Sequence, residues 1–161
     1  MKKTLLCIAV LLSMGLSACI PQKTTTSEQQ QNSSNLKNAP KSFVAIFEIP
    51  ATDISRAVDF YQTILGIHIE TIDMPGMEMG LFPSEGQMVY GVIVKGEGYT
   101  PSQNGPTIYL NGGDNLQTVL DKVEKSGGKV LVPKTLHADE SGYFALFLDS
   151  EGNKIGLHSL N

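Results

Sequence analysis

Hydrophobic side chains run almost without interruption over residues 43–49, which read FVAIFEI, and Pro50 follows them. Such a run predicts a strand that is buried on both faces and stopped by proline. Asp53 then stands where a helix N-cap residue is favoured, and Gly66, at offset 13 from it, predicts the left-handed end of that helix. Between them, one apolar stripe is formed at offsets 1, 4, 5 and 8 by Ile54, Ala57, Val58 and Tyr61.

The second half of the chain repeats this pattern. Residues 106–110 (PTIYL) predict a strand, Asn115 takes the place of Asp53, and Gly128 falls again at offset 13. The same offsets 1, 4, 5 and 8 are occupied by Leu116, Val119, Leu120 and Val123. The two patterns therefore predict two copies of one strand–helix unit.

Strand and turn signals after the first helix extend the repeat. Strand-like segments lie at about 67–72, 77–82 and 88–94, and the turn FPSEGQ (82–87) matches LDSEGN (148–153). The apolar stripe, the glycine after it and the Ser-Glu-Gly turn occur in the same order in both halves of the chain. This recurrence indicates an internal duplication with a period near 62 residues. We expect an α+β fold of two tandem βαβββ modules, at about 42–97 and 104–161, joined by a linker rich in Gly, Pro and Ser.

The first 41 residues have a different composition. A basic start at Met1-Lys2-Lys3 and an apolar run from Leu5 to Leu16 precede Cys19, which is the arrangement of a secretory signal. Residues 16–19 (LSAC) resemble the lipobox of bacterial lipoproteins. The resemblance implies a signal peptide over 1–18 and a membrane anchor at Cys19, whose acyl chains would include palmitate.

The stretch 19–41 is rich in Gln, Ser, Thr and Asn and nearly devoid of apolar residues, so we expect a lipidated cysteine followed by a disordered tether. The expected location is the cell envelope, on the outer membrane facing the periplasm in a Gram-negative host.

Overall composition narrows the class of protein. Apolar residues make up 41% of the 161 residues, enough for the core of one domain. A formal net charge of −4 argues against an extended basic surface for nucleic acid. With Cys7 and Cys19 as the two cysteines, a disulfide scaffold and a thiolate zinc cluster are excluded.

Within the duplicated region, four stretches carry a resemblance to the vicinal oxygen chelate superfamily, which includes glyoxalase I, bleomycin-resistance proteins and extradiol dioxygenases. They are FEIPATD (47–53), Arg56-Ala57 with Phe60-Tyr61, Leu65-Gly66, and DSEGNKIGLH (149–158). The resemblance covers nearly all of 42–161 and implies a curved sheet that forms a cup. It does not specify an activity, because different functions are built on this scaffold.

The resemblance also says where a metal would be bound. Metal-dependent members carry a histidine seven residues before the helix-capping residue and a glutamate on the last strand of each module. In this chain these four places hold Ile46, Tyr90, Ile108 and Gly156. Three of the four side chains have no donor atom for a divalent metal, so we expect no metal and no other cofactor.

Strand alternation then predicts the lining of the cup. Residues two apart on a strand face the same side. If Ile46 points into the cup, Glu48 therefore does too, and the same holds for Gly156 with His158 and for Ile108 with Leu110. The predicted lining is mostly apolar, with Glu48, Tyr90 and His158 as candidate ligand-binding residues. A contact between Glu48 and His158 would make an acid–base couple, but the sequence does not establish one.

Two functions from different classes remain open. The first is a membrane-anchored module that binds a small molecule in the cup without metal, and the second is a glyoxalase- or lyase-like enzyme with a non-standard site. A third interpretation is an interaction domain of the envelope whose cleft its own side chains fill. The expected partners are the membrane, through Cys19, and a small molecule, and not nucleic acid; the sequence leaves the oligomeric state open, a homodimer included.

Overall fold

The computed structural model describes residues 42–161 with the exception of Met88. The predicted signal peptide, Cys19 and the tether lie outside the described residues. The first module contains β1 (Ile46–Pro50), α2 (Ile54–Leu65), β2 (Glu70–Met74), β3 (Met77–Leu81) and β4 (Tyr90–Gly96). The second contains β5 (Tyr109–Asn111), α3 (Gln117–Val123), the short 3₁₀ helix η1 (Glu124–Ser126), β6 (Lys129–Leu136), β7 (Tyr143–Leu148) and β8 (Lys154–Ser159).

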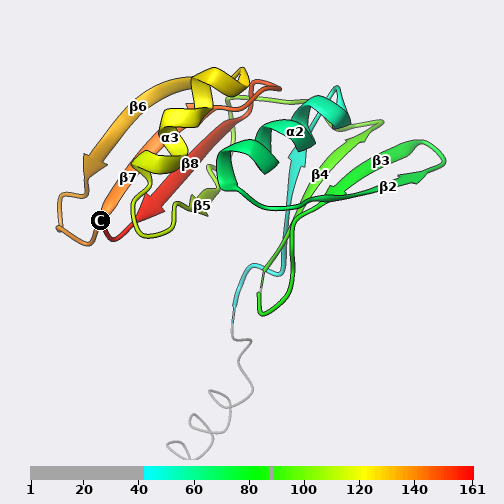
Figure 1. Cartoon of the computed structure of the whole chain (residues 1–161). Coiled ribbons are helices and arrows are strands. Elements are labelled where there is room, and N and C mark those ends of the chain that lie inside the picture. Colours follow the sequence, from blue (N-terminus) through cyan, green and yellow to red (C-terminus); the bar gives the residue numbers. More distant parts are fainter. Residues whose placement is uncertain (1–41, 88) are drawn as a thin grey trace, which may run out of the picture. The chain divides into compact units, whose positions relative to one another are not determined.

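Each module forms a four-stranded sheet with the same strand order. The first sheet runs β1-β4-β3-β2 and the second β5-β8-β7-β6, and in both the first strand pairs in parallel with the last. Figure 1 shows the two sheets to the two sides of α2. The α+β class and the two tandem βαβββ modules are confirmed.

The first helix follows its local signals. The Asp53 carboxylate accepts a hydrogen bond from the backbone N–H of Arg56 at 3.0 Å, as an N-cap residue should. Gly66 ends the helix in the left-handed conformation with φ 68°. Both predictions are confirmed, and the predicted stripe faces the core with Ala57, Val58 and Tyr61 buried.

The second helix differs at both ends. It begins at Gln117, and the Asn115 side chain accepts from the backbone N–H of Gln117 at 3.1 Å without being the N-cap residue. The left-handed glycine is Gly127, with φ 94°, and not Gly128. Gly128 is required for space instead, because a Cβ there would lie 2.6 Å from the carbonyl oxygen of Leu148.

The strand predicted at 106–110 is shorter and shifted in the structure. Its ladder begins at Tyr109, opposite Gly156, and ends at Asn111. Pro106, Thr107 and Ile108 lie outside the strand, although the carbonyl of Ile108 still accepts from the backbone N–H of Gly156 at 2.9 Å. The strands near 67–72 and 88–94 are likewise displaced along the chain, to Glu70–Met74 and Tyr90–Gly96.

One hydrophobic core serves both modules. It lies between the helices and one face of each sheet, and its largest fully buried side chains include Tyr61 of α2, Ile93 of β4, and Phe147 of β7. The rings of Phe60 and Phe147 lie 6.1 Å apart and join α2 of the first module to the second sheet. Each sheet consequently keeps one face that the helices do not cover, which we call its open face.

A single carboxylate connects the second module to the start of α2. Glu151 lies in the β7–β8 turn with a solvent-inaccessible side chain, and its Oε2 accepts from the backbone N–H groups of Thr52 and Asp53 at 2.8 and 3.1 Å. Arg56 donates from Nε to Oε1 at 2.7 Å and from Nη2 to Oε2 at 2.9 Å. We call these contacts the Glu151 clasp. Burial alone would raise the pKa of Glu151, but the hydrogen bonds from Arg56 and Thr52 outweigh it and lower the pKa from 4.5 to about 2.

Asp149 and Asn153 of the same β7–β8 turn form hydrogen bonds with α2, with the end of β1 and with the linker. We call this region, together with the Glu151 clasp, the α2 junction. The Asp149 carboxylate accepts from the hydroxyl of Tyr61 at 2.7 Å and from the side-chain amide of Asn153 at 2.9 Å. That amide also donates to the carbonyl of Pro50 at 2.8 Å, and its oxygen accepts from the backbone N–H of Ser102 in the linker at 3.0 Å. The turn therefore fixes α2, the end of β1 and the linker together.

We expect Glu151→Gln to destabilise the protein by about 1–3 kcal/mol at pH 7, because a charged acceptor with several donors is replaced by a neutral one. The pKa of Glu151 is lower in the folded state, so its stabilisation is present above about pH 4.5 and is lost as the pH falls towards 2. Urea unfolding between pH 7 and pH 2 should therefore show a steeper loss for the wild type than for the variant. Glu85→Gln, in the matching turn of the first module, is the control and should follow the wild type; equal slopes for wild type and Glu151→Gln would contradict the clasp.

Candidate functional site

The open face of the first sheet carries three of the predicted residues. Residues paired across a sheet share a face, and Ile46 lies opposite Tyr90 while Glu48 lies opposite Val92. Phe47, between them in β1, packs against the core. The structure thus places Ile46, Glu48 and Tyr90 together on the uncovered side.

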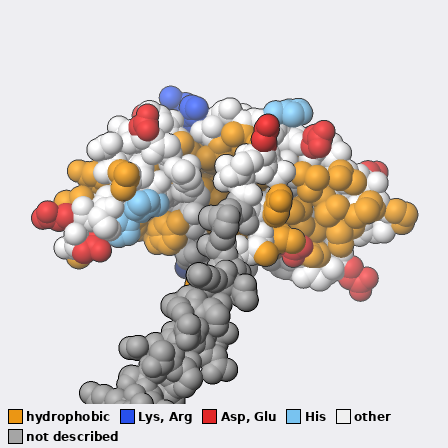
Figure 2. Space-filling view, turned by 90° about the horizontal axis from the view of Figure 1, so that it is seen from below, with side chains coloured by type: hydrophobic (Ala, Val, Ile, Leu, Met, Phe, Trp, Pro, Cys, Tyr) orange, Lys and Arg blue, Asp and Glu red, His pale blue; other side chains and the backbone are white. Residues whose placement is uncertain are grey.

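This face is strongly apolar although it is exposed to solvent. Ile46 is 59% exposed and Tyr90 is 49% exposed. In Figure 2, hydrophobic side chains gather over the right-hand half of the visible surface, the half occupied by the first sheet in Figure 1. Large apolar side chains grouped on an uncovered sheet face are typical of ligand- and partner-binding surfaces.

The second sheet corrects the predicted orientation of Ile108. Gly156 lies opposite Tyr109, so these two share the open face, whereas Ile108 and Leu110 pack against the core. The prediction that Ile108 and Leu110 point into the cup with Gly156 was wrong.

An extra residue between strand and helix explains the error. The backbone bond from Ala51 to the carbonyl of Val94 has its counterpart in the bond from Gly112 to the carbonyl of His158. Two positions separate Ala51 from Asp53, but three separate Gly112 from Asn115. Counting seven residues back from Asn115 therefore gives Ile108, one residue after the structural counterpart of Ile46. A shift of one residue along a strand moves the side chain to the opposite face.

Tyr109 occupies the space above Gly156. A Cβ added to Gly156 would lie 2.4–2.7 Å from ring atoms of Tyr109, and the Tyr109 side chain is 48% exposed. The ring thus lies flat over the glycine on the open face. By the same count from Gly112, Tyr109 is the counterpart of Glu48, so an aromatic side chain stands in the second module where the first has a carboxylate.

His158 belongs to an aromatic group at the other end of this face. Phe144 lies opposite His158 in the ladder, and the ring centroids of His137 and His158 are 5.4 Å apart. His137 also packs on Phe144, with centroids 4.8 Å apart. Among the described residues, no hydrogen bond or ion pair joins His158 to Glu48, so the structure does not form the acid–base couple.

Glu48 has a different partner, which the sequence interpretation missed. The hydroxyl of Tyr99, in the linker between the modules, donates to the Glu48 carboxylate at 3.0 Å. This hydrogen bond, together with burial and the nearby charge, raises the pKa of Tyr99. Tyr99 is the one aromatic residue in a linker otherwise rich in Gly, Pro and Ser, and that isolated position is the signal that could have drawn attention to it.

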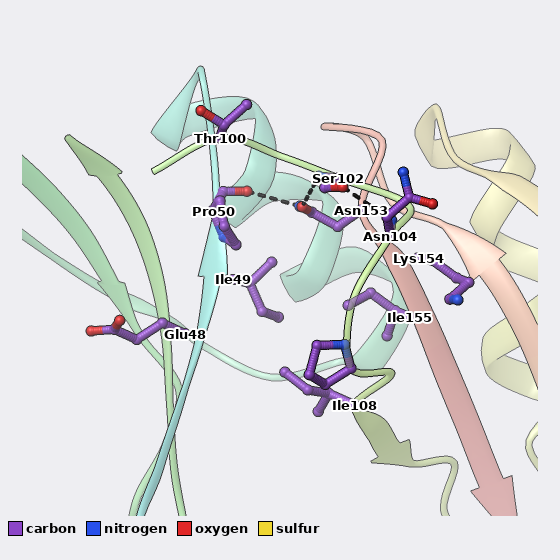
Figure 3. Close-up of a pocket in the computed structure, with 11 residues that line it drawn as sticks. Glu48, Ile49, Pro50, Thr100, Ser102, Asn104, Ile108, Asn153, Lys154 and Ile155 are labelled. Atoms are coloured by element: carbon purple, nitrogen blue, oxygen red, sulfur yellow. Dashed lines mark hydrogen bonds between the residues drawn. The ribbon is translucent and has the colours of Figure 1, made fainter. Parts of the chain in front are cut away.

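A small cleft lies beside Glu48, at the junction of β1, the linker and β8. Its volume is about 190 Å³, and its lining includes Ile49, Ile108, Ile155 and Lys154. Figure 3 shows the Glu48 carboxylate turned away from Ile108 and Ile155. Tyr90 and His158 do not line it, so the three candidate residues are not brought together in this cleft.

The donor set does not fit a divalent metal. The places derived from the sequence hold Ile46, Tyr90, Ile108 and Gly156, and the correspondence of Ala51 with Gly112 moves the third of them to Thr107. Isoleucine and glycine have no side-chain donor atom, and neutral Tyr and Thr hydroxyls are poor ligands. Within the part of the chain that the structure describes, no group of three or more His, Cys, Asp or Glu side chains is placed to hold a metal ion. Nor does that part contain a helix long and apolar enough to cross a membrane.

Comparison with protein families agrees with this architecture. Residues 44–157 match the model of the Glyoxalase/Bleomycin resistance protein/Dioxygenase superfamily. A "Glyoxylase-like domain-containing protein" from Didymella fabae is 33% identical over 111 residues, which cover 66% of this chain and 84% of that protein.

Solved structures show the same fold. Glyoxalase I from Zea mays superposes with a TM-score of 0.58 at 19% identity over 72% of this chain, but the chain covers only 45% of the maize protein. An antibiotic-binding protein from Streptomyces gives a TM-score of 0.57 at 24% identity, covering 73% of this chain and 95% of that one. A glyoxalase/bleomycin resistance protein from Albidiferax ferrireducens gives 0.58 at 17% identity, covering 73% and 98%.

We expect Gly156→Ala to destabilise the protein by about 1–3 kcal/mol, because the new methyl group would collide with the Tyr109 ring. In a Tyr109→Ser background the same substitution should cost much less, since nothing then covers Gly156. A double-mutant cycle from urea unfolding measures this coupling. Additive effects of the two substitutions would show that Tyr109 does not lie over the glycine.

Proposed function

This chain belongs to the Glyoxalase/Bleomycin resistance protein/Dioxygenase superfamily, and we propose that it binds a small, partly apolar organic molecule on its open faces without using a metal ion. The proposal places the ligand against β1 and β4 of the first sheet and against β5 and β8 of the second. Its polar contacts would come from Glu48 with Tyr99, from the hydroxyl of Tyr90, and from His158.

The observation that carries the proposal is the set of half-exposed side chains on the open faces, Ile46 and Tyr90 on the first sheet and Tyr109 on the second. Leaving such side chains in water costs free energy that burial under a ligand would recover. A few polar groups among apolar walls are the composition expected of a small-molecule site. The missing metal donors at the same places favour recognition by packing over Lewis-acid chemistry.

The named relatives support binding as one role of this scaffold. The Streptomyces protein is described as antibiotic binding, and this chain covers almost all of its length. Other relatives are glyoxalases, and a glyoxalase-like reaction is the alternative. That alternative needs an acid or base in contact with the reacting atoms, yet Glu48 accepts a hydrogen bond from Tyr99 and His158 packs at a tilt against His137. Binding without catalysis is therefore the function that the geometry supports best.

We further propose that the chain is a lipoprotein of the bacterial cell envelope, anchored through Cys19. The support comes from residues 1–41, where a basic start, an apolar run and the LSAC sequence precede a polar stretch. A ligand site held at a membrane would then act outside the cytoplasm, away from the glutathione pool.

The first test of ligand binding uses native mass spectrometry of protein from its host, followed by a thermal-shift screen of small metabolites and glycopeptide drugs. For any compound that binds, Tyr90→Phe and Glu48→Gln should each weaken affinity several-fold, because each loses a hydrogen bond worth about 0.5–1.5 kcal/mol while preserving shape. The melting temperature without ligand should hardly change. Tyr143→Phe, on a residue that packs against the core, is the matched control and should keep full affinity.

If Tyr90→Phe and Glu48→Gln lower stability but leave affinity unchanged, these residues are structural. If no compound binds, the interpretation as an interaction domain replaces the proposal.

For anchoring, we expect Cys19→Ser to accumulate as an unlipidated precursor, because the serine hydroxyl cannot form the thioether. Labelling cells with a palmitate analogue, together with membrane fractionation, measures the effect. Cys7→Ser is the control, since Cys7 lies within the predicted signal peptide and should not affect processing. Normal labelling of Cys19→Ser would contradict the proposal.

A further inference from the structure

A second cavity lies on the helix side of the molecule, away from the open faces. Its volume is about 580 Å³. It is bounded by the end of α2, by residues of the stretch 82–87 and Val89 between β3 and β4, and by the segment that leads from β5 into α3. Ligand sites usually fall between about 300 and 1,000 Å³, so this cavity has room for a small molecule.

The internal duplication explains why the cavity is there. The turn FPSEGQ (82–87) corresponds to LDSEGN (148–153), so the first module has Pro83 and Gln87 where the second has Asp149 and Asn153. In the second module the turn closes the space beside α2 through the Glu151 clasp and through the hydrogen bond from the Tyr61 hydroxyl to Asp149. In the first module Glu85, the counterpart of Glu151, is exposed.

The helix side of the junction has changed in the same way. With the period of 62 residues, Arg56 corresponds to Thr118 and Tyr61 to Val123. Both side chains are shorter, and valine has no hydroxyl to donate to the turn. The counterparts of Arg56, Tyr61 and Asp149 thus lack the groups that close the α2 junction, and the cavity lies at the corresponding place beside α3.

The walls of this cavity are apolar and its rim is polar. Phe47, Ile64, Phe82, Leu110 and Val119 are among the wall residues. Phe47 and Phe82 are in edge-to-face contact, with centroids 5.8 Å apart. Of the described residues at the rim, Lys122 is the cation; it is exposed and lies one helical turn after Thr118, another rim residue.

Charge complementarity selects the occupant. Among the described residues, Lys122 takes part in no ion pair, and an ammonium at the edge of an apolar cavity complements a carboxylate whose hydrocarbon part lies inside. The acidic rim residue, Glu85, is on the turn side, so the carboxylate should lie on the α3 side.

We propose that this cavity is a second ligand site, specific for a small monocarboxylate with an apolar chain, with Lys122 binding the carboxylate. The inference is independent of the function proposed for the open faces, because it uses different elements and different side chains.

Isothermal titration of the full chain with sodium decanoate tests this inference, with 1-decanol as the uncharged comparison. We expect one saturable site for decanoate, weaker binding of 1-decanol, and a loss of decanoate affinity of at least about tenfold in Lys122→Glu. Lys125→Glu changes charge equally just beyond the end of α3 but outside this cavity, and should bind like the wild type. Thr118→Trp, at an exposed rim position, should obstruct the cavity and also weaken binding.

Several results would overturn the inference. They are the absence of saturable decanoate binding, equal losses for Lys122→Glu and Lys125→Glu, and undiminished binding in Thr118→Trp. Tyr90→Phe distinguishes the two sites. If decanoate binds this variant with unchanged affinity, the helix-side site is distinct from the open face. If Tyr90→Phe lowers decanoate affinity and Lys122→Glu does not, decanoate binds on the open face.

Discussion

The hydrogen bonds of one buried carboxylate fix the start of α2 to the last turn of the second module. Glu151 comes from the last turn of the chain, yet it accepts the first backbone N–H groups before α2 and holds Arg56 of that helix. The start of a helix has donors without intrahelical partners, and a carboxylate there is stabilised by them and by the helix dipole. Asp149 and Asn153 extend the same turn to Tyr61, Pro50 and the linker. Because β1 ends at this junction, the position of its open face relative to the second sheet depends on these contacts.

The duplication is symmetric in topology and asymmetric in chemistry. Both sheets have the same strand order, but among the described residues the hydrogen-bonded network of charged and polar side chains lies at the α2 junction. At α3 the corresponding residues are Pro83, Gln87, Thr118 and Val123, which cannot rebuild that network. Satisfying a buried carboxylate requires several donors at once, so the loss of one partner makes retention of the others unfavourable. A junction of this kind is therefore expected to carry either the whole network or none of it, and at α3 the structure has a cavity in place of the network.

The parts of the structure that depend on short-range signals could be predicted from the sequence. The cap at Asp53, the left-handed Gly66 and the repeated module all follow from residues within one element or from the comparison of two similar segments. The face of Ile108 could not be predicted in this way, because one extra residue before α3 reverses strand parity without leaving a hydrophobic signal. The bond from Tyr99 to Glu48 and the Glu151 clasp join residues about 50 and 95 positions apart, and no local pattern encodes such contacts.

The replacement of metal donors by packing side chains also changes what the open faces can recognise. A metal site selects ligands through a few directional bonds, and it needs donors whose geometry is fixed by the strands that carry them. Here the corresponding region contains Ile46 and Tyr90 on one sheet and the Tyr109 ring over Gly156 on the other. Such a surface gains free energy in proportion to the apolar area that a ligand covers, and it obtains specificity from a few hydrogen bonds at the edge. Metal-dependent members of the superfamily carry His and Glu at these places, whereas the residues present here offer a ligand apolar contact area and a few polar groups.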